Sequence, residues 1–250
     1  MKAKLKQGDC HEELPKLEEN VVDLCLVDPP YSVTSASWDQ QPLDWENLWE
    51  ELNRVVKETA PFVFTASQPF TTDLIQSNRE AFRYTLVWVK ESPSGALNAK
   101  KKPMTKHEDV VVFYRKAGAY NSLAEPLDDP IDHHREGDTD DHVYMDREPS
   151  VQTEKGFATS VIRAGKRDSD VLQHPTGKPT DLMVRLIKMY SDEGDTVLDF
   201  TMGSGTTGVA SMEENRDFIG FERKDKYFKT AQERIEEAKS KQSQIQKFFE

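Results

Sequence analysis

Residues 196–208 read T-V-L-D-F-T-M-G-S-G-T-T-G, and this stretch decides the fold class. Its first five residues are mostly apolar and β-branched, which predicts a buried strand. Gly203, Gly205 and Gly208 then match the G-x-G-x-x-G spacing of a tight turn that opens a helix. A strand, a glycine turn and a helix in this order place a ligand site at the carboxyl end of a sheet.

The next predicted strand, Phe218–Glu222, ends in an acid that could bind ribose hydroxyls. The glycine spacing fits NAD as well as S-adenosylmethionine, and it also fits a tight turn that holds no ligand. Two features favour S-adenosylmethionine. Asp199 would repel a pyrophosphate but could serve the ammonium group of a methionine moiety. Only one strand follows this unit, whereas a dinucleotide site needs a second mononucleotide half.

Buried strands and amphipathic helices alternate along most of the chain. The predicted strands are residues 3–7, 21–27, 62–65, 84–89, 109–114, 196–200 and 218–222, and the predicted helices are about 45–56, 72–81, 180–190, the segment after 208, and the tail from 226. This alternation predicts a doubly wound α/β fold, a mostly parallel sheet with helices on both faces. The length of 250 residues suits a single domain over 1–250, with a polar stretch at 117–171 that lacks core periodicity.

Charge and composition argue against several classes of protein. The net charge of −12 argues against a general nucleic-acid coat protein, because phosphate binding needs Lys and Arg. The charge is uneven, however, with seven bases and three acids between Lys90 and Lys116. A mean hydropathy of −0.74 and the lack of a long apolar run predict no membrane span. The charged start predicts no secretory signal, and Cys10 and Cys25 predict no disulfide and a reducing cytoplasm.

A second motif, Asp28-Pro29-Pro30-Tyr31, follows another predicted strand. An amino group on an aromatic ring is a poor nucleophile because its lone pair is delocalised into the ring. The Asp28 side chain and a backbone carbonyl near Pro29 are two acceptors that could grip both N–H bonds and turn the lone pair toward an electrophile. The prolines stiffen the backbone, and Tyr31 offers a face on which a base can stack. The alternative is a turn that only ends the strand.

Together these motifs resemble the β-class DNA amino-methyltransferases. In that family Asp-Pro-Pro-Tyr comes first, a target-recognition region lies in the middle and the cofactor motif comes last, and this chain has that order. The further segments that are similar are Gly8-Asp9-Cys10, His107–Phe113, His174–Pro179 and Val197–Phe200. The resemblance covers nearly the whole chain except about 117–171. It implies the methyltransferase form of the doubly wound sheet, with a circularly permuted motif order and an inserted target-recognition segment at 117–171.

The resemblance also implies a role for each matching residue, with S-adenosylmethionine as the cofactor. Asp28, Pro29, Pro30 and Tyr31 hold the flipped base. The residues implied to bind the cofactor are Asp9, His174, Pro175, Thr176, Lys178, Asp199, Phe200, Gly203, Ser204, Gly205, Thr206 and Glu222. Among these, Asp199 and the glycine turn surround the methionine part, Glu222 takes the ribose hydroxyls and Asp9 meets the adenine. Phe200 stands where the family often has proline, and its ring could face the sulfonium.

The expected activity is methyl transfer to adenine N6 in double-stranded DNA at a specific sequence, by base flipping and in-line attack. N4-cytosine methylation stays open, although the cytosine enzymes of this class more often carry Ser where Asp28 stands. A non-catalytic DNA-binding protein is the other alternative, and the intact Asp28 and Gly203 argue against it. The resemblance implies a homodimer. No metal site is predicted, because His133, His134 and His142 match no zinc spacing.

Overall fold

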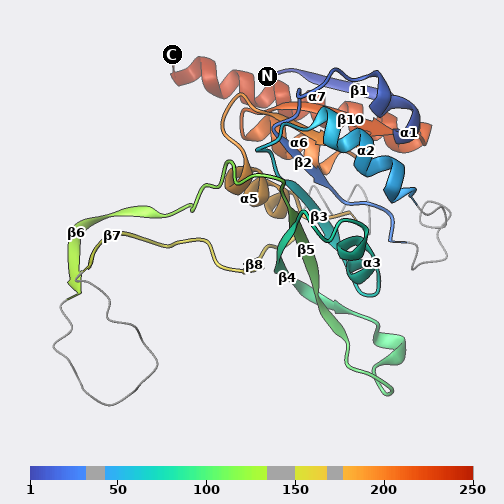
Figure 1. Cartoon of the computed structure of the whole chain (residues 1–250). Helices are drawn as coiled ribbons and strands as arrows, with labels where there is room; N and C mark the ends of the chain where they lie inside the picture. The colour runs from blue at the N-terminus through green and yellow to red at the C-terminus, as the bar shows by residue number, and fades with distance from the viewer. Residues whose placement is uncertain (32–42, 134–149, 168–176, 250) are drawn as a thin grey trace. The chain divides into compact units, whose positions relative to one another are not determined.

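The computed structural model describes residues 1–31, 43–133, 150–167 and 177–249 (Figure 1). The chain falls into two compact units: the main unit, Met1–Tyr120 with Ser160–Glu250, and the small unit, Asn121–Thr159. Within the described residues, no helix combines the length and the apolar character needed to cross a membrane. The glycine turn and the Asp-Pro-Pro-Tyr motif both belong to the main unit, so the site can be described within that unit alone.

An eight-stranded sheet forms the centre of the main unit. Its strands are β1 (Ala3–Gln7), β2 (Leu24–Val27), β3 (Phe62–Ala66), β4 (Phe82–Ser94), β5 (Thr105–Phe113), β8 (Val161–Arg163), β9 (Thr196–Asp199) and β10 (Asp217–Glu222). They lie in the order β1-β10-β9-β2-β3-β5-β4-β8. All neighbours pair in parallel except β5, which runs antiparallel to β3 and β4. The prediction of a mostly parallel α/β sheet is confirmed.

Helices accompany the sheet in two groups. The first group is α1 (Cys10–Glu13), η1 (Leu14–Lys16), α2 (Trp45–Val55) and α3 (Phe70–Ser77), and the second is α5 (Thr180–Tyr190), α6 (Thr206–Glu213) and α7 (Asp225–Phe249). The first group shares one core cluster with the central strands, whereas α6 of the second group packs against α5, α7 and β10. Every residue of β2 and β3 is buried, as expected for strands covered on both faces. Helix α3 begins and ends earlier than the predicted 72–81.

Aromatic rings fill the core beneath α2. The Trp49 ring lies 5.4 Å from Phe62 and 5.2 Å from Phe113, between ring centroids. Its indole N–H donates to Ser77 Oγ at 2.9 Å, so the one polar atom of this buried side chain has a partner. The spacing of two residues puts Phe62 and Phe64 on one face of β3, where both meet Trp49. This packing anchors β3 beside β2, the strand that leads into Asp-Pro-Pro-Tyr.

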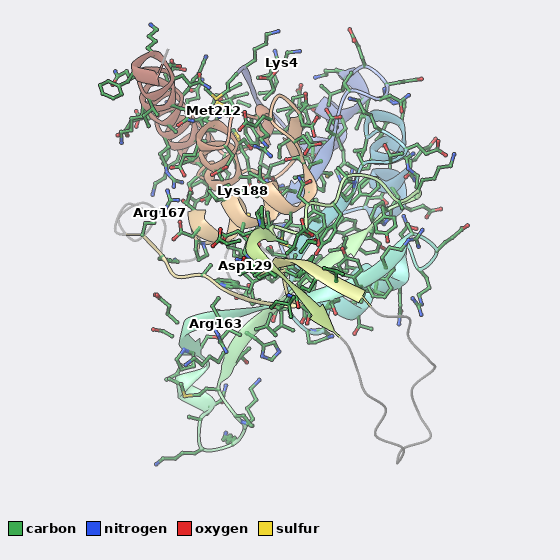
Figure 2. All side chains as sticks on the ribbon, turned by 90° about the vertical axis from the view of Figure 1, so that its left-hand side faces the viewer. Lys4, Asp129, Arg163, Arg167, Lys188 and Met212 are labelled. Atoms are coloured by element: carbon green, nitrogen blue, oxygen red, sulfur yellow. The ribbon has the colours of Figure 1, made fainter. Side chains whose placement is uncertain are left out.

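Strands β4 and β5 continue beyond the other strands as a long hairpin, which we call the β4–β5 arm (Figure 1). Its outer part, residues 91–104, is exposed throughout and includes η2 (Ala96–Asn98) and a run of three lysines, Lys100–Lys102. Figure 2 shows the side chains of the arm standing away from the rest of the main unit. The predicted strand 84–89 is shorter than β4, because the added residues are largely polar and include a proline.

The small unit is a two-stranded antiparallel sheet of β6 (Glu125–His133) and β7 (Ser150–Lys155). The sequence predicts no strand here, because β6 contains four acids and two prolines and lacks an apolar alternation. The stretch 117–171 also contributes β8 to the main sheet, where Ile162 is buried beside β4. The small unit is therefore narrower than the predicted recognition segment. That this segment reads the DNA sequence stays a prediction.

Candidate active site

The two motifs meet because their strands are neighbours. Strands β2 and β9 pair in parallel, with Cys25 opposite Leu198, so both end at the same edge of the sheet. Asp28 follows β2, and Asp199 is the last residue of β9. The Thr201 hydroxyl donates to the Asp28 carbonyl oxygen at 3.4 Å, which links the loops after the two strands. The two motifs, which are far apart in the sequence, therefore lie together at one site.

A cavity of about 1380 Å³ opens at this edge and reaches both motifs. Most small-molecule sites are about 300–1,000 Å³, so there is room for a cofactor and for a base. The predicted site residues on its wall are Asp9, Asp28, Pro29, Pro30, Tyr31, Lys178, Asp199, Phe200, Gly203, Ser204, Thr206 and Glu222. The predictions for His174, Pro175 and Thr176 lie outside the described residues.

The glycine turn uses its glycines for two different reasons. Gly203 and Gly205 have φ angles of +53° and +83°, a region that residues with a side chain rarely adopt. A Cβ on Gly205 would lie 2.9 Å from the Ala231 Cβ of α7, whereas a Cβ on Gly203 would meet nothing within 4 Å. Gly205 therefore allows α7 to pack against the turn, and Gly203 leaves the backbone open toward the cavity.

Glu222, at the end of β10, is held by two backbone N–H groups. Gly203 N–H donates to Oε2 at 3.1 Å, and Lys224 N–H donates to Oε1 at 2.7 Å. Burial raises the pKa of this carboxyl, and the two N–H donors oppose the rise. A carboxylate fixed in this way is suited to accept hydrogen bonds from a pair of ribose hydroxyls.

Asp199 is a buried carboxyl, with 2% of its surface exposed. Burial raises its pKa to about 7, hydrogen bonds from the Thr207 side chain and the Thr201 N–H oppose this, and the charges of Asp28 and Glu222 add to it. The Thr201 N–H donates to Oδ1 at 3.1 Å. A carboxylate in such surroundings is stabilised by a cation, so this end of the cavity suits an ammonium group.

Two of the residues predicted to bind the cofactor, Phe200 and Ser204, contact other parts of the protein. Phe200 is 1% exposed, and its ring lies 6.3 Å from that of Phe64 in the core, so it offers little aromatic surface to a sulfonium. Ser204 is held by Arg234 of α7, whose guanidinium donates to the Ser204 carbonyl at 2.7 Å. The sequence did not indicate Arg234, because it lies in a charged helical tail without a motif.

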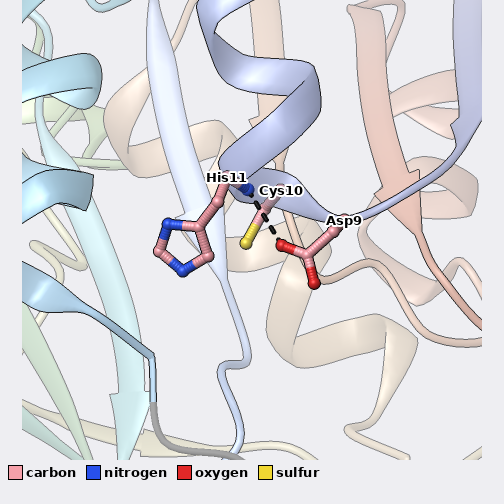
Figure 3. Close-up of side chains that lie close together, drawn as sticks. All are labelled: Asp9, Cys10 and His11. Atoms are coloured by element: carbon pink, nitrogen blue, oxygen red, sulfur yellow. Dashed lines mark hydrogen bonds between the residues drawn. The ribbon is translucent and has the colours of Figure 1, made fainter.

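Asp9 lines the cavity and also begins a helix (Figure 3). Its Oδ1 accepts the His11 N–H at 3.0 Å and so caps α1. Each of Asp9, Cys10 and His11 has one atom that could bind a metal ion, and these three atoms lie within 4.8 Å of one another. Burial and the neighbouring Asp9 raise the pKa of the Cys10 thiol to about 12. Asp9, Cys10 and His11 are consecutive residues at the start of α1, so the helix cap by itself explains why their side chains lie close together.

The Asp28 carboxylate is the centre of a hydrogen-bond network. The Tyr31 hydroxyl lies 2.9 Å from Asp28 Oδ1 and 3.0 Å from Thr65 Oγ1, and the Thr65 hydroxyl donates to the same Oδ1. Lys178 Nζ forms an ion pair with this oxygen at 3.0 Å. These donors orient Asp28, whose side chain remains 32% exposed. Thr65 belongs to β3, so its part in the network depends on the pairing of β2 with β3.

The Tyr31 ring is already packed against another aromatic ring. Phe70 stacks on it with centroids 5.2 Å apart and an interplanar angle of 20°. Burial and the charge of Asp28 hold the pKa of Tyr31 well above its ordinary value, so the hydroxyl remains a donor. Because Phe70 covers one face of the ring, at most the other face is available to a base.

Lys178 contacts the Asp-Pro-Pro-Tyr corner, although the resemblance places it in the cofactor segment. Its Nζ lies 3.0 Å from Asp28 Oδ1 and 2.9 Å from Glu108 Oε2. Glu108 of β5 pairs through its other oxygen with Lys90 of β4 at 3.2 Å. Burial favours the neutral amine, but the carboxylates of Asp28 and Glu108 outweigh it and hold the pKa of Lys178 well above its ordinary value. The sequence did not single out Glu108 or Lys90, because their roles depend on how β4 and β5 pair.

The chain matches a known family over most of its length. The family model described as DNA methylase, of the N6/N4 methyltransferase type, matches residues 22–233. The chain is 25% identical to the Type II methyltransferase M1.MboII of Moraxella bovis, over 91% of this chain and 94% of that relative. It is 28% identical to the DNA adenine methyltransferase YhdJ of Escherichia coli (strain K12), over 92% of this chain and 82% of that relative.

Solved structures share the fold. The M1.HpyAVI–SAM complex matches with a TM-score of 0.64 and 22% identity, covering 93% of this chain and 98% of that one. The cytosine-N4-specific PvuII DNA methyltransferase matches with a TM-score of 0.68 and 16% identity, covering 97% and 93%. Because the family match spans residues 22–233 and the fold agrees with it, the chain belongs to the DNA methylase family of the N6/N4 methyltransferase type.

Proposed function

We propose that this protein transfers the methyl group of S-adenosylmethionine to the N6 amino group of adenine in double-stranded DNA, at a specific sequence. The observation that carries the proposal is that Asp28 and Asp199 share one cavity in a chain of the DNA methylase family. A base inside a duplex cannot reach such a cavity, so the target base is turned out of the stack.

The residues present fit the cofactor, which supplies an electrophilic methyl group on a sulfonium centre. Asp199, buried and close to other acids, suits the ammonium group of the methionine part. Glu222, fixed by two N–H groups, suits the ribose hydroxyls, and Gly203 leaves room for close approach. The M1.HpyAVI structure solved with SAM has the same fold, which supports the same cofactor.

Asp28 acts on the base. Its carboxylate accepts one N–H of the amino group and a carbonyl near Pro29 accepts the other, so the nitrogen lone pair is aimed along the path of transfer. Most of the rate enhancement comes from holding the nitrogen in contact and in line with the reacting carbon. Asp28 need not be a strong base, because the N–H becomes acidic only as the nitrogen gains positive charge.

The charge at position 28 favours adenine over cytosine. A carboxylate holds an N–H more strongly than the serine hydroxyl that is more common in cytosine enzymes of this class. The similarity to YhdJ, a DNA adenine methyltransferase, supports the same base. Cytosine N4 is the second candidate, because the cytosine-N4-specific PvuII enzyme shares the fold.

The test is the identity of the product. The protein is incubated with S-adenosylmethionine and unmethylated genomic DNA, and the digested nucleosides are identified by mass spectrometry. We expect N6-methyladenine, and sequencing of the product would give the recognition sequence. N4-methylcytosine as the sole product would overturn the adenine assignment only. DNA binding without any methylated product would overturn the enzyme function and favour a non-catalytic DNA-binding protein.

Assembly as a homodimer, implied by the resemblance, stays a prediction. Sedimentation equilibrium should then give twice the chain mass of 28.6 kDa for the free protein, and a complex with DNA should contain two chains. A monomer under both conditions would contradict it and leave the proposed reaction untouched.

A further inference from the structure

One side chain engages both features that a target base is proposed to use. The base donates an N–H to Asp28 and stacks on Tyr31. Lys178 Nζ lies 3.0 Å from Asp28 Oδ1 and 5.0 Å from the centroid of the Tyr31 ring. The Lys178 side chain is only 9% exposed, so its ammonium is committed to these contacts rather than solvated.

We propose that the Lys178 ammonium holds the place of the target amino group in the DNA-free enzyme and leaves Asp28 when the base enters. This inference rests on the proposed role of Asp28 in gripping the amino group. The ammonium and the amino group both present N–H donors to the same carboxylate beside the same Tyr31 ring, so they compete for the same space. Oδ1 also accepts from Thr65 and lies next to the Tyr31 hydroxyl, which leaves it little capacity for a further donor.

Glu108 provides the place to which Lys178 withdraws. Its Oε2 is already 2.9 Å from Nζ, so the ammonium can leave Asp28 without losing every charged partner. Without Glu108 the move would leave an uncompensated buried charge, which is strongly unfavourable. The Glu108 carboxylate is itself held by Lys90 at 3.2 Å and is 16% exposed, so it is a fixed partner between β4 and β5.

The charge of Lys178 lets it occupy this position without reacting. A neutral amine held by Asp28 would be a better nucleophile than an aromatic amino group and would itself accept the methyl group. Although burial favours the neutral form, the carboxylates of Asp28 and Glu108 keep the pKa of Lys178 well above its ordinary value. The protonated nitrogen has no lone pair, so Lys178 is not methylated while it forms the ion pair with Asp28.

This competition predicts effects of opposite sign for two substitutions. If the open state is about a tenth of the DNA-free enzyme, the apparent affinity for the flipped base is lowered about tenfold. Lys178→Met removes the competing donor, so it should strengthen binding of the base. Glu108→Gln weakens the alternative partner, so Lys178 stays on Asp28 and binding of the base should weaken. A purely structural role predicts that both variants lose affinity.

The test compares two duplexes that carry the sequence methylated by the wild type and differ only at the target, which is adenine or an abasic site. S-adenosylhomocysteine is present throughout, so no turnover occurs. The ratio of the abasic to the adenine dissociation constant isolates the base from the phosphate contacts. We expect this ratio to rise about tenfold in Lys178→Met. It should fall severalfold in Glu108→Gln, and the double variant should match Lys178→Met.

Controls separate this inference from the proposed function. Lys178→Arg keeps a charged donor and should return the ratio to the wild-type value. An unchanged ratio in Lys178→Met, or a lower ratio in both single variants, would overturn the place-holder role. Calorimetric binding of S-adenosylhomocysteine shows that each variant is folded. If Asp28→Ala still methylated DNA at the normal rate, the base site itself would be misplaced and the proposed function would fail independently of Lys178.

Discussion

At the scale of single residues, the site contains several acidic side chains whose closeness does not stabilise the fold. Asp28, Asp199 and Glu222 line one cavity, and Asp199 is almost fully buried. Removing a carboxylate from water costs free energy unless donors or a cation replace the lost hydration. Asp199 has hydrogen-bond donors, yet its pKa still rises to about 7, mainly because of burial. We expect this cost to be offset only when a cationic ligand is bound.

Asp199→Asn should therefore stabilise the ligand-free protein while it weakens cofactor binding. The folded-state pKa of about 7 lies above the ordinary aspartate pKa of 3.8, so ionised Asp199 destabilises the fold at high pH. The penalty is complete above about pH 7, reaches about 4 kcal/mol at most, and vanishes as the pH falls toward 4. The gain in Tm of the variant should be largest near pH 8 and absent near pH 4. Equal Tm values at pH 8 would contradict it.

The effect of Asp199→Asn on cofactor binding can be measured by calorimetry. Removing a charged acceptor from a buried site should weaken S-adenosylmethionine binding at least about tenfold. Wild-type affinity should also fall as the pH drops below about 7, because protonated Asp199 no longer attracts an ammonium group. Unchanged affinity in the folded Asn variant would refute this placement of the pocket.

Asp28→Ala should separate the two halves of the site. Asp28 is proposed to act on the base, so the variant should bind S-adenosylmethionine normally and lose methyl transfer by about a hundredfold or more. Asp28→Asn is the matched control, because it keeps an acceptor for the Thr65 hydroxyl but removes the charge. We expect it to be intermediate in kcat. Normal turnover of the Ala variant would mean that the corner only ends a strand.

At the scale of elements, the β4–β5 arm is a basic projection on an acidic protein. Residues 91–104 are exposed, and Lys100–Lys102 lie within this part. The chain as a whole carries a net charge of −12, so an evenly spread surface charge would repel DNA. A local cluster of bases on an arm can still meet phosphates and position the duplex.

Replacing Lys100, Lys101 and Lys102 by alanine should weaken DNA binding and leave cofactor binding unchanged. Each lost phosphate contact should flatten the dependence of log affinity on log salt by about 0.9. The control replaces Lys229, Lys239 and Lys241 of α7, which changes the net charge equally and removes only surface ion pairs. An equal loss in both triple variants would show that only the net charge matters.

At the scale of the whole molecule, the described cavity residues and the small unit belong to different parts of the chain. The residues that line the cavity all belong to the main unit. The small unit, Asn121–Thr159, is an antiparallel pair of strands with its own internal contacts. Exposed apolar side chains on it include Ile131, Val151 and Phe157. A unit whose described residues do not line the cavity can vary without altering the reaction.

Exchanging residues 121–159 for the corresponding segment of a relative with another recognition sequence should change the DNA sequence that is methylated. The modified base and the cofactor affinity should stay the same, because the cavity is retained. Methylation-sensitive sequencing of DNA from expressing cells is the measurement. An unaltered target sequence in an active chimera would move the search for base readout to the β4–β5 arm.

The class of fold and the two motifs could be predicted from the sequence, because apolar spacing and the chemistry of glycine and proline act locally. Asp28 and Asp199 could be picked out from their places at strand ends. Strands β6, β7 and β8 could not, since backbone hydrogen bonds hold strands without an apolar pattern. Only the tertiary structure brought Thr65 and Lys178 to the same oxygen of Asp28, and Glu108 to Lys178. These residues are far apart in the chain, and the order of the strands together with the segment that leads into α5 decides which of them meet.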